Sequence, residues 1–261
     1  MTGLRVFFIG GLMSYRALFY WLRPWLYLPV MLGGPFFQII FFVYLGRVTR
    51  TRSAEYFVVG NAMQACAMAG IFGMTMVIAN ERSYGTLSSV LATPANRAAL
   101  FFGRGLPLVL NGLVVSTFGF LVGRTVLDVT LPADRVPLVA AAVAVSTVSC
   151  TAGGLLLGSV GLVSRDIFFA ANLVYFATLL LCGVNVPPGR LPSWMEVLGR
   201  FLPLRHGVAA ARAAIAGEDP ATVWRLIGIE AAVACAYAAA AFFGLRLLER
   251  SAQRHAMLER L

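Results

Sequence analysis

The chain has 261 residues, of which 59% are hydrophobic and only 12% are charged, and its mean hydropathy is +0.81. This composition lies well outside the range of soluble domains and indicates an integral membrane protein. The net charge is +10, and all 21 basic residues are arginine. Because the chain has no lysine, a phosphate-binding P-loop and a Schiff-base enzyme are both excluded.

The segment 1–23, before the first long apolar run, predicts a helix that lies in the membrane interface. On a helix Arg5, Arg16 and Arg23 fall within about 20° of one another, and the other faces carry Phe7 and Trp21 among other apolar residues. Arginines would then face lipid phosphates while the aromatic rings reach the acyl chains. The alternative is a plain extension of the first span.

Uncharged runs along the rest of the chain predict six membrane spans, because a bilayer core of about 30 Å needs about 20 apolar residues per helix. The spans are expected at 24–46, 56–80, 98–123, 137–163, 167–187 and 224–245. The fold class is therefore an all-α integral membrane protein, with 1–261 forming a single transmembrane domain. An even number of spans places both termini on the same side.

The segment 81–97, between the second and third spans, predicts a short amphipathic helix. Tyr84, Leu87 and Leu91 recur at helical spacing and form one apolar stripe, and Pro94 ends the helix. Such a helix between two spans is a candidate docking element for a soluble partner. The alternative is a solvated loop helix.

The segment 188–220, before the last span, predicts two short helices. Ser193 and Glu196 have capping-box spacing, Pro203 ends the first helix, and the second runs over 204–216 with Gly217 in the C-cap position. Lengths of about 14 and 20 Å are too short to cross a bilayer. Both helices are expected to lie on, or dip into, one face of the membrane.

The distribution of arginine leaves the orientation of the spans open. With both termini cytoplasmic, that side holds eleven arginines and the opposite side holds ten. The positive-inside rule therefore gives no preference. The same even spread argues against nucleic acid as a partner.

Two of these segments resemble the ABC type-2 membrane permeases, which export drugs, antibiotics and cell-surface polysaccharides. The first resemblance is a Glu-Arg-x-x-Gly-Thr-Leu motif followed by Leu, Thr-Pro and Arg, here Glu81, Arg82, Gly85, Thr86, Leu87, Leu91, Thr93, Pro94 and Arg97. The second is a Leu-Pro-x-Trp, Pro, Arg pattern before the last span, here Leu191, Pro192, Trp194, Pro203 and Arg212, with Gly217 after it. Six spans and both motifs stand in the family's order.

The resemblance implies a non-enzymatic transport subunit in a bacterial plasma membrane, with both termini and the 81–97 coupling loop cytoplasmic and 188–220 an extracellular re-entrant segment. Two such permease chains would form a homodimer or heterodimer and bind two copies of a separate ATPase subunit. The partner ATPase would bind ATP and Mg, so no cofactor is expected in this chain. Motion of the ATPase would reach the membrane through the first motif, with Leu87 and Leu91 as docking residues.

Candidate residues for the transport path are polar or aromatic groups within the spans. Those in the first, second and fifth spans are Phe37, Phe41, Asn61, Asn172, Tyr175 and Phe176. For the amides, hydrogen bonding between helices is the alternative, and for the rings it is packing against lipid or neighbouring helices.

Glu230 is the acidic residue well inside an apolar span. Because acidic groups are rare there, it is a candidate for a functional role. Pairing with Arg225 or Arg212 is the structural interpretation, and proton coupling is the functional one. The cysteines and the two histidines have no metal-site spacing, so no metal is expected.

The leading interpretation is the permease of an ATP-driven exporter of a hydrophobic or amphiphilic compound, such as a drug, antibiotic or natural product. The alternative within the family is export of a polysaccharide or lipid-linked glycan. A membrane enzyme is disfavoured because the loop carboxylates are scattered along the sequence. A scaffold without ATP coupling is the remaining alternative.

Overall fold

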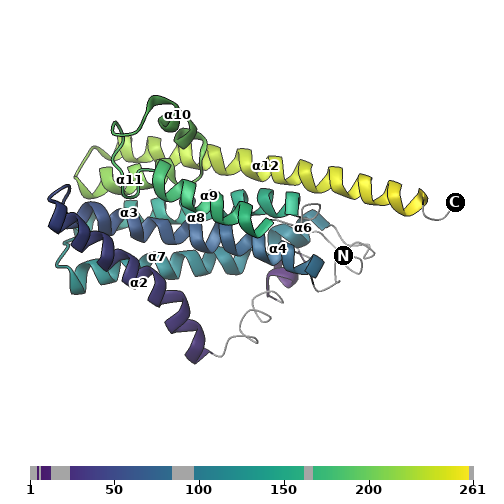
Figure 1. Ribbon diagram of the computed structural model, residues 1–261, viewed down its shortest axis with the longest axis horizontal. Coiled ribbons are helices and arrows are strands. Elements are labelled where there is room, and N and C mark those ends of the chain that lie inside the picture. The colour runs from purple at the N-terminus through teal and green to yellow at the C-terminus, as the bar shows by residue number, and fades with distance from the viewer. Residues whose placement is uncertain (1–4, 6, 13–23, 84–96, 162–166, 259–261) are drawn as a thin grey trace.

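The computed structural model describes residues 5, 7–12, 24–83, 97–161 and 167–258 (Figure 1). Residues 7–12 are helical. The further elements are α2 (Pro24–Thr49), α3 (Ala54–Ala67), the π-helical turn η1 (Met68–Phe72), α4 (Gly73–Ser83), α6 (Arg97–Gly103), α7 (Gly105–Val126), the 3-10 turn η2 (Ala133–Arg135), α8 (Val136–Gly161), α9 (Ile167–Leu181), α10 (Ser193–Phe201), α11 (Arg205–Ile215) and α12 (Pro220–Leu258). The expected all-α fold class is confirmed over these residues.

Within the described residues, five helical stretches are long and apolar enough to cross a membrane. They are Met31–Thr49, Ala54–Ile78, Ala99–Val126, Ala133–Val160 and Pro220–Leu247, and they coincide with five of the six expected spans. The fifth expected span, 167–187, is helical only over the 15 residues of α9, which rise about 22 Å. Gly183 has a φ of +77° and prolines follow it, so the helix cannot continue to residue 187. A membrane crossing by 167–187 therefore remains a prediction.

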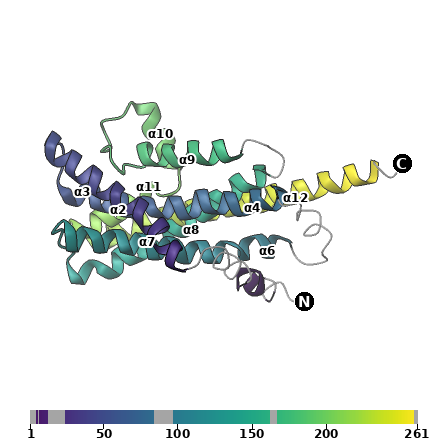
Figure 2. The ribbon, with the colours of Figure 1, turned by 60° about the horizontal axis from the view of Figure 1, so that its bottom comes forward.

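Helix α8 lies at the centre of the bundle, where it packs against α4, η1, α7, α11 and α12 (Figures 1 and 2). Its close approach depends on small residues four positions apart. A Cβ atom at Gly154 would meet the backbone of Gly70 and Ile71, and one at Gly158 would meet the side chain of Ile78. Helices in membranes associate through such small residues because these let the backbones come close.

Helix α2 lies at the periphery and packs mainly on α3 and α7. Ile39 and Val43 are buried against α3 and α7, whereas Phe37 and Phe41 are exposed. One stripe of the helix therefore joins the bundle, and no described residue covers the face that carries Phe37 and Phe41.

The two ends of the bundle carry different segments. Figures 1 and 2 show both chain ends together with the end of α4 and the start of α6, and α10 and α11 at the opposite end. The 39-residue α12 projects past the other helices toward the C-terminus (Figure 1). This arrangement places the termini and the flanks of the predicted coupling loop on one side.

The N-terminal segment contacts the junction between α6 and α7. A Cβ at Gly103 would meet the backbone of Phe7, and one at Gly11 would meet the backbone of Gly103. Backbone-to-backbone contact of this kind holds residues 7–12 against the bundle. Arg16 and Arg23 lie outside the described residues, so the interfacial orientation of the whole 1–23 helix remains a prediction.

Candidate functional site

The predicted coupling motif is described only at its flanks. Glu81 and Arg82 lie in the last turn of α4, and Arg97 is the first residue of α6. The central residues Gly85, Thr86, Leu87, Leu91, Thr93 and Pro94 lie outside the described residues. The structure thus brings both flanks to the end of the bundle that holds the termini, and the docking role of the motif stays a prediction.

A polar network joins α2, α3 and α9 at the position of two predicted pathway residues. The side-chain amide of Asn61 donates hydrogen bonds to the Phe57 carbonyl (2.9 Å) and to Asn185 Oδ1 (2.8 Å), and its oxygen accepts one from Gln38 Nε2 (2.9 Å). The Tyr175 hydroxyl donates to Gln38 Oε1 (3.5 Å). Asn61 and Tyr175 are therefore brought together through Gln38, in the contact between helices.

The buried Gln64 extends this network one turn along α3. Its Nε2 donates to the Tyr175 carbonyl (3.3 Å) and to Thr178 Oγ1 (3.1 Å). Among the described residues, the Asn172 side chain donates to the Phe168 carbonyl of its own helix, at 2.9 Å, and to no other helix. Of the predicted pathway amides, Asn61 thus connects helices and Asn172 does not.

Three of the predicted pathway rings, Phe37, Phe41 and Phe176, lie on the outer faces of α2 and α9, whereas Tyr175 lies half-buried in the polar network. Phe37 is 70% exposed, Phe41 61% and Phe176 59%. Phe168 and Phe169 on α9 are exposed as well. These rings are free to contact lipid or a second chain.

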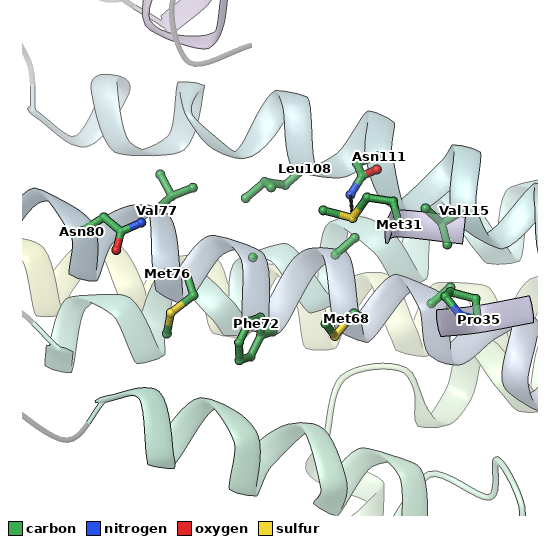
Figure 3. Close-up of a pocket in the computed structure, with 13 residues that line it drawn as sticks. Met31, Pro35, Met68, Phe72, Met76, Val77, Asn80, Leu108, Asn111 and Val115 are labelled. Atoms are coloured by element: carbon green, nitrogen blue, oxygen red, sulfur yellow. Dashed lines mark hydrogen bonds between the residues drawn. The ribbon is translucent and has the colours of Figure 1, made fainter. Parts of the chain in front are cut away.

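An apolar groove of about 270 Å³ lies between α2, α7 and the continuous stretch α3–η1–α4 (Figure 3). Its lining includes Met31, Met68 and Met76 together with Phe72, and the Asn111 amide donates to Met31 Sδ at 3.9 Å. The predicted pathway residues do not line it. The sequence signal that identifies it is the stripe formed by residues 68, 72 and 76, each four positions from the next.

The π-helical turn η1 forms part of this groove. Gly70, in the middle of η1, lies against Cys150 and Thr151 of α8, while Met68 and Phe72 at its two ends line the groove. A π-helical turn inserts one residue into an α-helix and is often found at functional sites. Here it lets one helix contact α8 on one face and the groove on another.

Glu230 is fully buried on α12 and binds the N-terminus of α11. Its Oε1 accepts a hydrogen bond from the N–H of Leu204 (2.7 Å), and its Oε2 accepts from the N–H groups of His206 (3.1 Å) and Gly207 (3.1 Å). The first N–H groups of a helix have no partner within it and carry partial positive charge, so a carboxylate stabilises them. The prediction that Glu230 pairs with Arg225 or Arg212 is therefore wrong, because both carboxylate oxygens bind backbone N–H groups within residues 204–207 instead.

Arg212, on α11, connects three segments of the chain. Its Nη1 donates to the Gly183 carbonyl (2.6 Å), and its Nη2 donates to the carbonyls of Tyr56 (3.1 Å) and Val184 (2.9 Å). Its guanidinium lies 3.6 Å from the centroid of the Tyr56 ring. Burial lowers the pKa of Arg212 to about 10, so the guanidinium remains charged at neutral pH.

The other predicted residues of the 188–220 segment lie at the start of α10 and just after its end. Pro192 is the N-cap of α10 and Ser193 is its first helical residue, and Glu196 accepts a hydrogen bond from the N–H of Gly189. The predicted Ser193–Glu196 capping box is therefore wrong, because proline leaves the N-cap no N–H to donate. Trp194 is exposed and Pro203 is buried.

Gly217 ends α11 as predicted. Its φ is +78°, its N–H donates to the Ala214 carbonyl (3.2 Å), and the N–H of Glu218 donates to the Ala213 carbonyl (3.0 Å). This pair of bonds is a Schellman motif, which favours glycine because of its left-handed backbone. The α11 helix it ends is buried between α3, α8 and α12.

Comparison with known proteins identifies the family. Residues 10–216 match the sequence profile of the ABC-2 type transporters. The chain belongs to this family. A probable multidrug ABC transporter permease, YbhR, from Escherichia coli strain K12 is 25% identical over 159 residues, and its counterpart from E. coli O157:H7 is similar to the same extent. The alignment covers 58% of this ABC-2 chain and 41% of each relative, so this chain matches less than half the length of those proteins.

Proposed function

We propose that this ABC-2 chain is the membrane-spanning subunit of an ATP-driven exporter that moves a hydrophobic or amphiphilic compound out of a bacterial cell. The observation that carries the proposal is the match of residues 10–216 to the ABC-2 family. The relatives named as probable multidrug permeases favour a small lipophilic cargo. The chain itself would supply binding surfaces and motion rather than catalysis.

The proposed coupling element is the 81–97 loop, with two ATPase copies docking on two permease chains. The flanks of this loop, at the end of α4 and the start of α6, lie at the end of the bundle that holds both termini (Figure 1). We take this end of the bundle to be cytoplasmic. The apolar residues Leu87 and Leu91 would occupy a groove of the ATPase. Because α4 continues through η1 into α3, displacement of the loop would be transmitted directly to the methionine-lined groove.

The lining of that groove supports a lipophilic cargo over a glycan. Apart from the side-chain amides of Asn80 and Asn111, the lining side chains are apolar. Methionine side chains are unbranched and polarisable, and they adapt to ligands of different shapes. A polysaccharide needs many hydrogen-bonding groups along its path.

The proposed dimer places the exposed aromatic faces of α2 and α9 toward a second permease chain. Phe37, Phe41 and Phe176 are more than half exposed in the single chain. A transport path between two chains would then have aromatic walls contributed by both. This arrangement leaves open whether the second chain is identical to the first.

The first experiment purifies the permease from its host in mild detergent and identifies bound proteins by mass spectrometry. We expect an ATP-binding-cassette subunit at two copies per two permease chains. The variant with Leu87→Asp and Leu91→Asp should lose it, and the control with Ser88→Asp and Ser89→Asp, which adds the same charge to other faces of the predicted helix, should retain it. If no ATPase is bound to the intact, folded chain, the result would contradict the proposal and favour a scaffold without ATP coupling.

The second experiment reconstitutes the permease with its ATPase in proteoliposomes and measures ATP-dependent movement of a lipophilic cationic dye. Transport that requires ATP and is lost in the Leu87→Asp, Leu91→Asp variant supports the exporter. A folded complex that hydrolyses ATP but moves only lipid-linked glycans would instead establish the alternative cargo.

A further inference from the structure

A pocket of about 370 Å³ lined by three arginines lies at the end of the bundle that carries α10 and α11. It is formed by the turn before α3, the first turn of α3, the segment after α9, and α11. The lining residues that matter most are Arg52, Tyr56, Gly183, Pro187, Arg205 and Arg212. Its volume lies within the range of sites that bind small molecules, about 300–1,000 Å³.

The three arginines of this pocket have different attachments. Arg212 is held by the three carbonyls described above, and Arg205 Nη1 donates to the Leu181 carbonyl at 3.1 Å. Arg52 is exposed, and its guanidinium lies 5.6 Å from the centroid of the Tyr56 ring. Within the described part of the chain, none of the three forms an ion pair with a carboxylate. Carbonyl oxygens orient these groups but do not cancel their charge.

The like charges act on one another across the pocket. Burial is the main cause of the lowered pKa of Arg212, and the positive charges of Arg205 and Arg52 lower it further. Glu230 lies near this end of the bundle, on α12, but both of its oxygens accept hydrogen bonds from backbone N–H groups of α11. The residues that line the pocket therefore include three arginines and no carboxylate, an arrangement that an anion would stabilise.

We propose that this arginine pocket binds a phosphate group, with Arg52 and Arg205 as its ligands and Arg212 as the residue that holds the pocket walls together through its bonds to the carbonyls of Tyr56, Gly183 and Val184. The flat guanidinium presents paired N–H donors that match phosphate oxygens. Three positive charges favour a dianionic phosphate monoester over a singly charged carboxylate. The phosphate is either the headgroup of an amphiphile in the adjacent leaflet or free phosphate. Binding at this site does not depend on the proposed export.

The test titrates the purified chain with phosphatidic acid, with zwitterionic phosphatidylcholine of the same acyl chains, and with inorganic phosphate. Native mass spectrometry counts the bound lipids, and calorimetry follows inorganic phosphate. We expect one phosphatidic acid per chain to bind at least about tenfold more tightly than phosphatidylcholine. The variant with Arg52→Gln and Arg205→Gln should lose at least about tenfold in affinity, since each contact involves a full charge.

A matched control removes two arginines at the same end of the bundle that do not line the pocket. The variant with Arg124→Gln and Arg225→Gln should bind phosphatidic acid within about twofold of the wild type, since distant exposed charges are screened. The variant with Arg52→Lys and Arg205→Lys keeps both charges and should bind more tightly than the glutamine variant. Arg52→Gln alone changes an exposed side chain, so its reduced affinity would report binding rather than folding.

The probes separate the two sources of the phosphate. Competition by inorganic phosphate at similar concentration identifies a free-phosphate site, whereas binding of phosphatidic acid alone identifies a lipid headgroup site. Either result supports the proposal if it depends on Arg52 and Arg205. Equal binding of phosphatidylcholine and phosphatidic acid, or unchanged affinity in the glutamine variants, would overturn it.

Discussion

Helices α2 and α8 have the same length of 26 residues, and both are strongly apolar. Their places in the structure differ. Helix α8 lies at the centre and contacts helices on several sides, while α2 joins the bundle along one stripe. Apolar length alone therefore identifies a span and does not say where the span lies in the bundle.

The difference follows from side-chain size and shape. In α8, Gly154 and Gly158 let the backbones of neighbouring helices approach, whereas a Cβ at Gly33 or Gly34 of α2 would meet nothing within 4 Å. Helix α2 carries pairs of adjacent phenylalanines and two internal prolines. Helix α2 contributes Met31 and Pro35 to the methionine-lined groove, and its Phe37 and Phe41 lie on a face that no described helix covers.

The largest expected effect comes from Gly154→Leu in α8. The added side chain would collide with the backbone of Gly70 and Ile71, which cannot move without displacing η1. We expect a loss of more than about 3 kcal/mol of folding free energy, at the upper end of overpacking effects. Thermal unfolding in detergent measures it. Gly34→Leu in α2 is the matched control and should leave the midpoint nearly unchanged; equal losses would remove the distinction between the helices.

The second prediction compares the stability contributions of the buried and exposed faces of α2. Ile39→Ala empties a fully buried position and should cost about 2 to 3 kcal/mol. Phe37→Ala removes a ring that is 70% exposed and should change the stability of the single chain by less than about 0.5 kcal/mol. Cross-linking should show that Phe37→Ala weakens the proposed dimer. The reverse order of stability losses would show that α2 packs by its other face.

A smaller effect tests how α11 is held against α12. Glu230→Gln removes the charge that accepts three backbone N–H bonds at the start of α11, and we expect a cost of about 1 to 2 kcal/mol. Glu218→Gln, at an exposed site, is the control. ATP-dependent export by the folded Glu230→Gln protein should persist. Complete loss of export at an unchanged unfolding midpoint would show an essential carboxylate instead.

A smaller effect on stability than that of Glu230→Gln is expected for Met68→Trp in the groove beside α2. The larger side chain would fill open space next to Phe72 and Met76, so stability should change by less than about 1 kcal/mol. Export of a lipophilic dye should fall by about tenfold, as RT ln 10 is about 1.4 kcal/mol of lost binding. Val114→Trp, on an exposed position outside the groove lining, is the control. Undiminished export with Met68→Trp would exclude the groove from the path.

The sequence was informative wherever a local pattern has a single structural solution. Long uncharged runs predicted six spans, five of which coincide with helices long enough to cross a membrane, and Gly217 after an alanine-rich segment predicted the end of α11. It was wrong where the partner lies far away in the chain. Glu230 was expected to pair with Arg225 or Arg212, but its carboxylate accepts hydrogen bonds from the N–H groups of Leu204, His206 and Gly207.

Composition, periodicity and the two motifs were enough to determine an all-α membrane chain and to recognise its family, because membrane helices must satisfy their backbone hydrogen bonds locally. The tertiary structure decided which apolar helix is central, which face of α3 and α4 forms the groove, and what Glu230 and Arg212 bind. Those partners are backbone N–H and C=O groups, which every residue carries. Sequence patterns therefore cannot distinguish them, and only the packing of distant segments brings them within hydrogen-bonding distance.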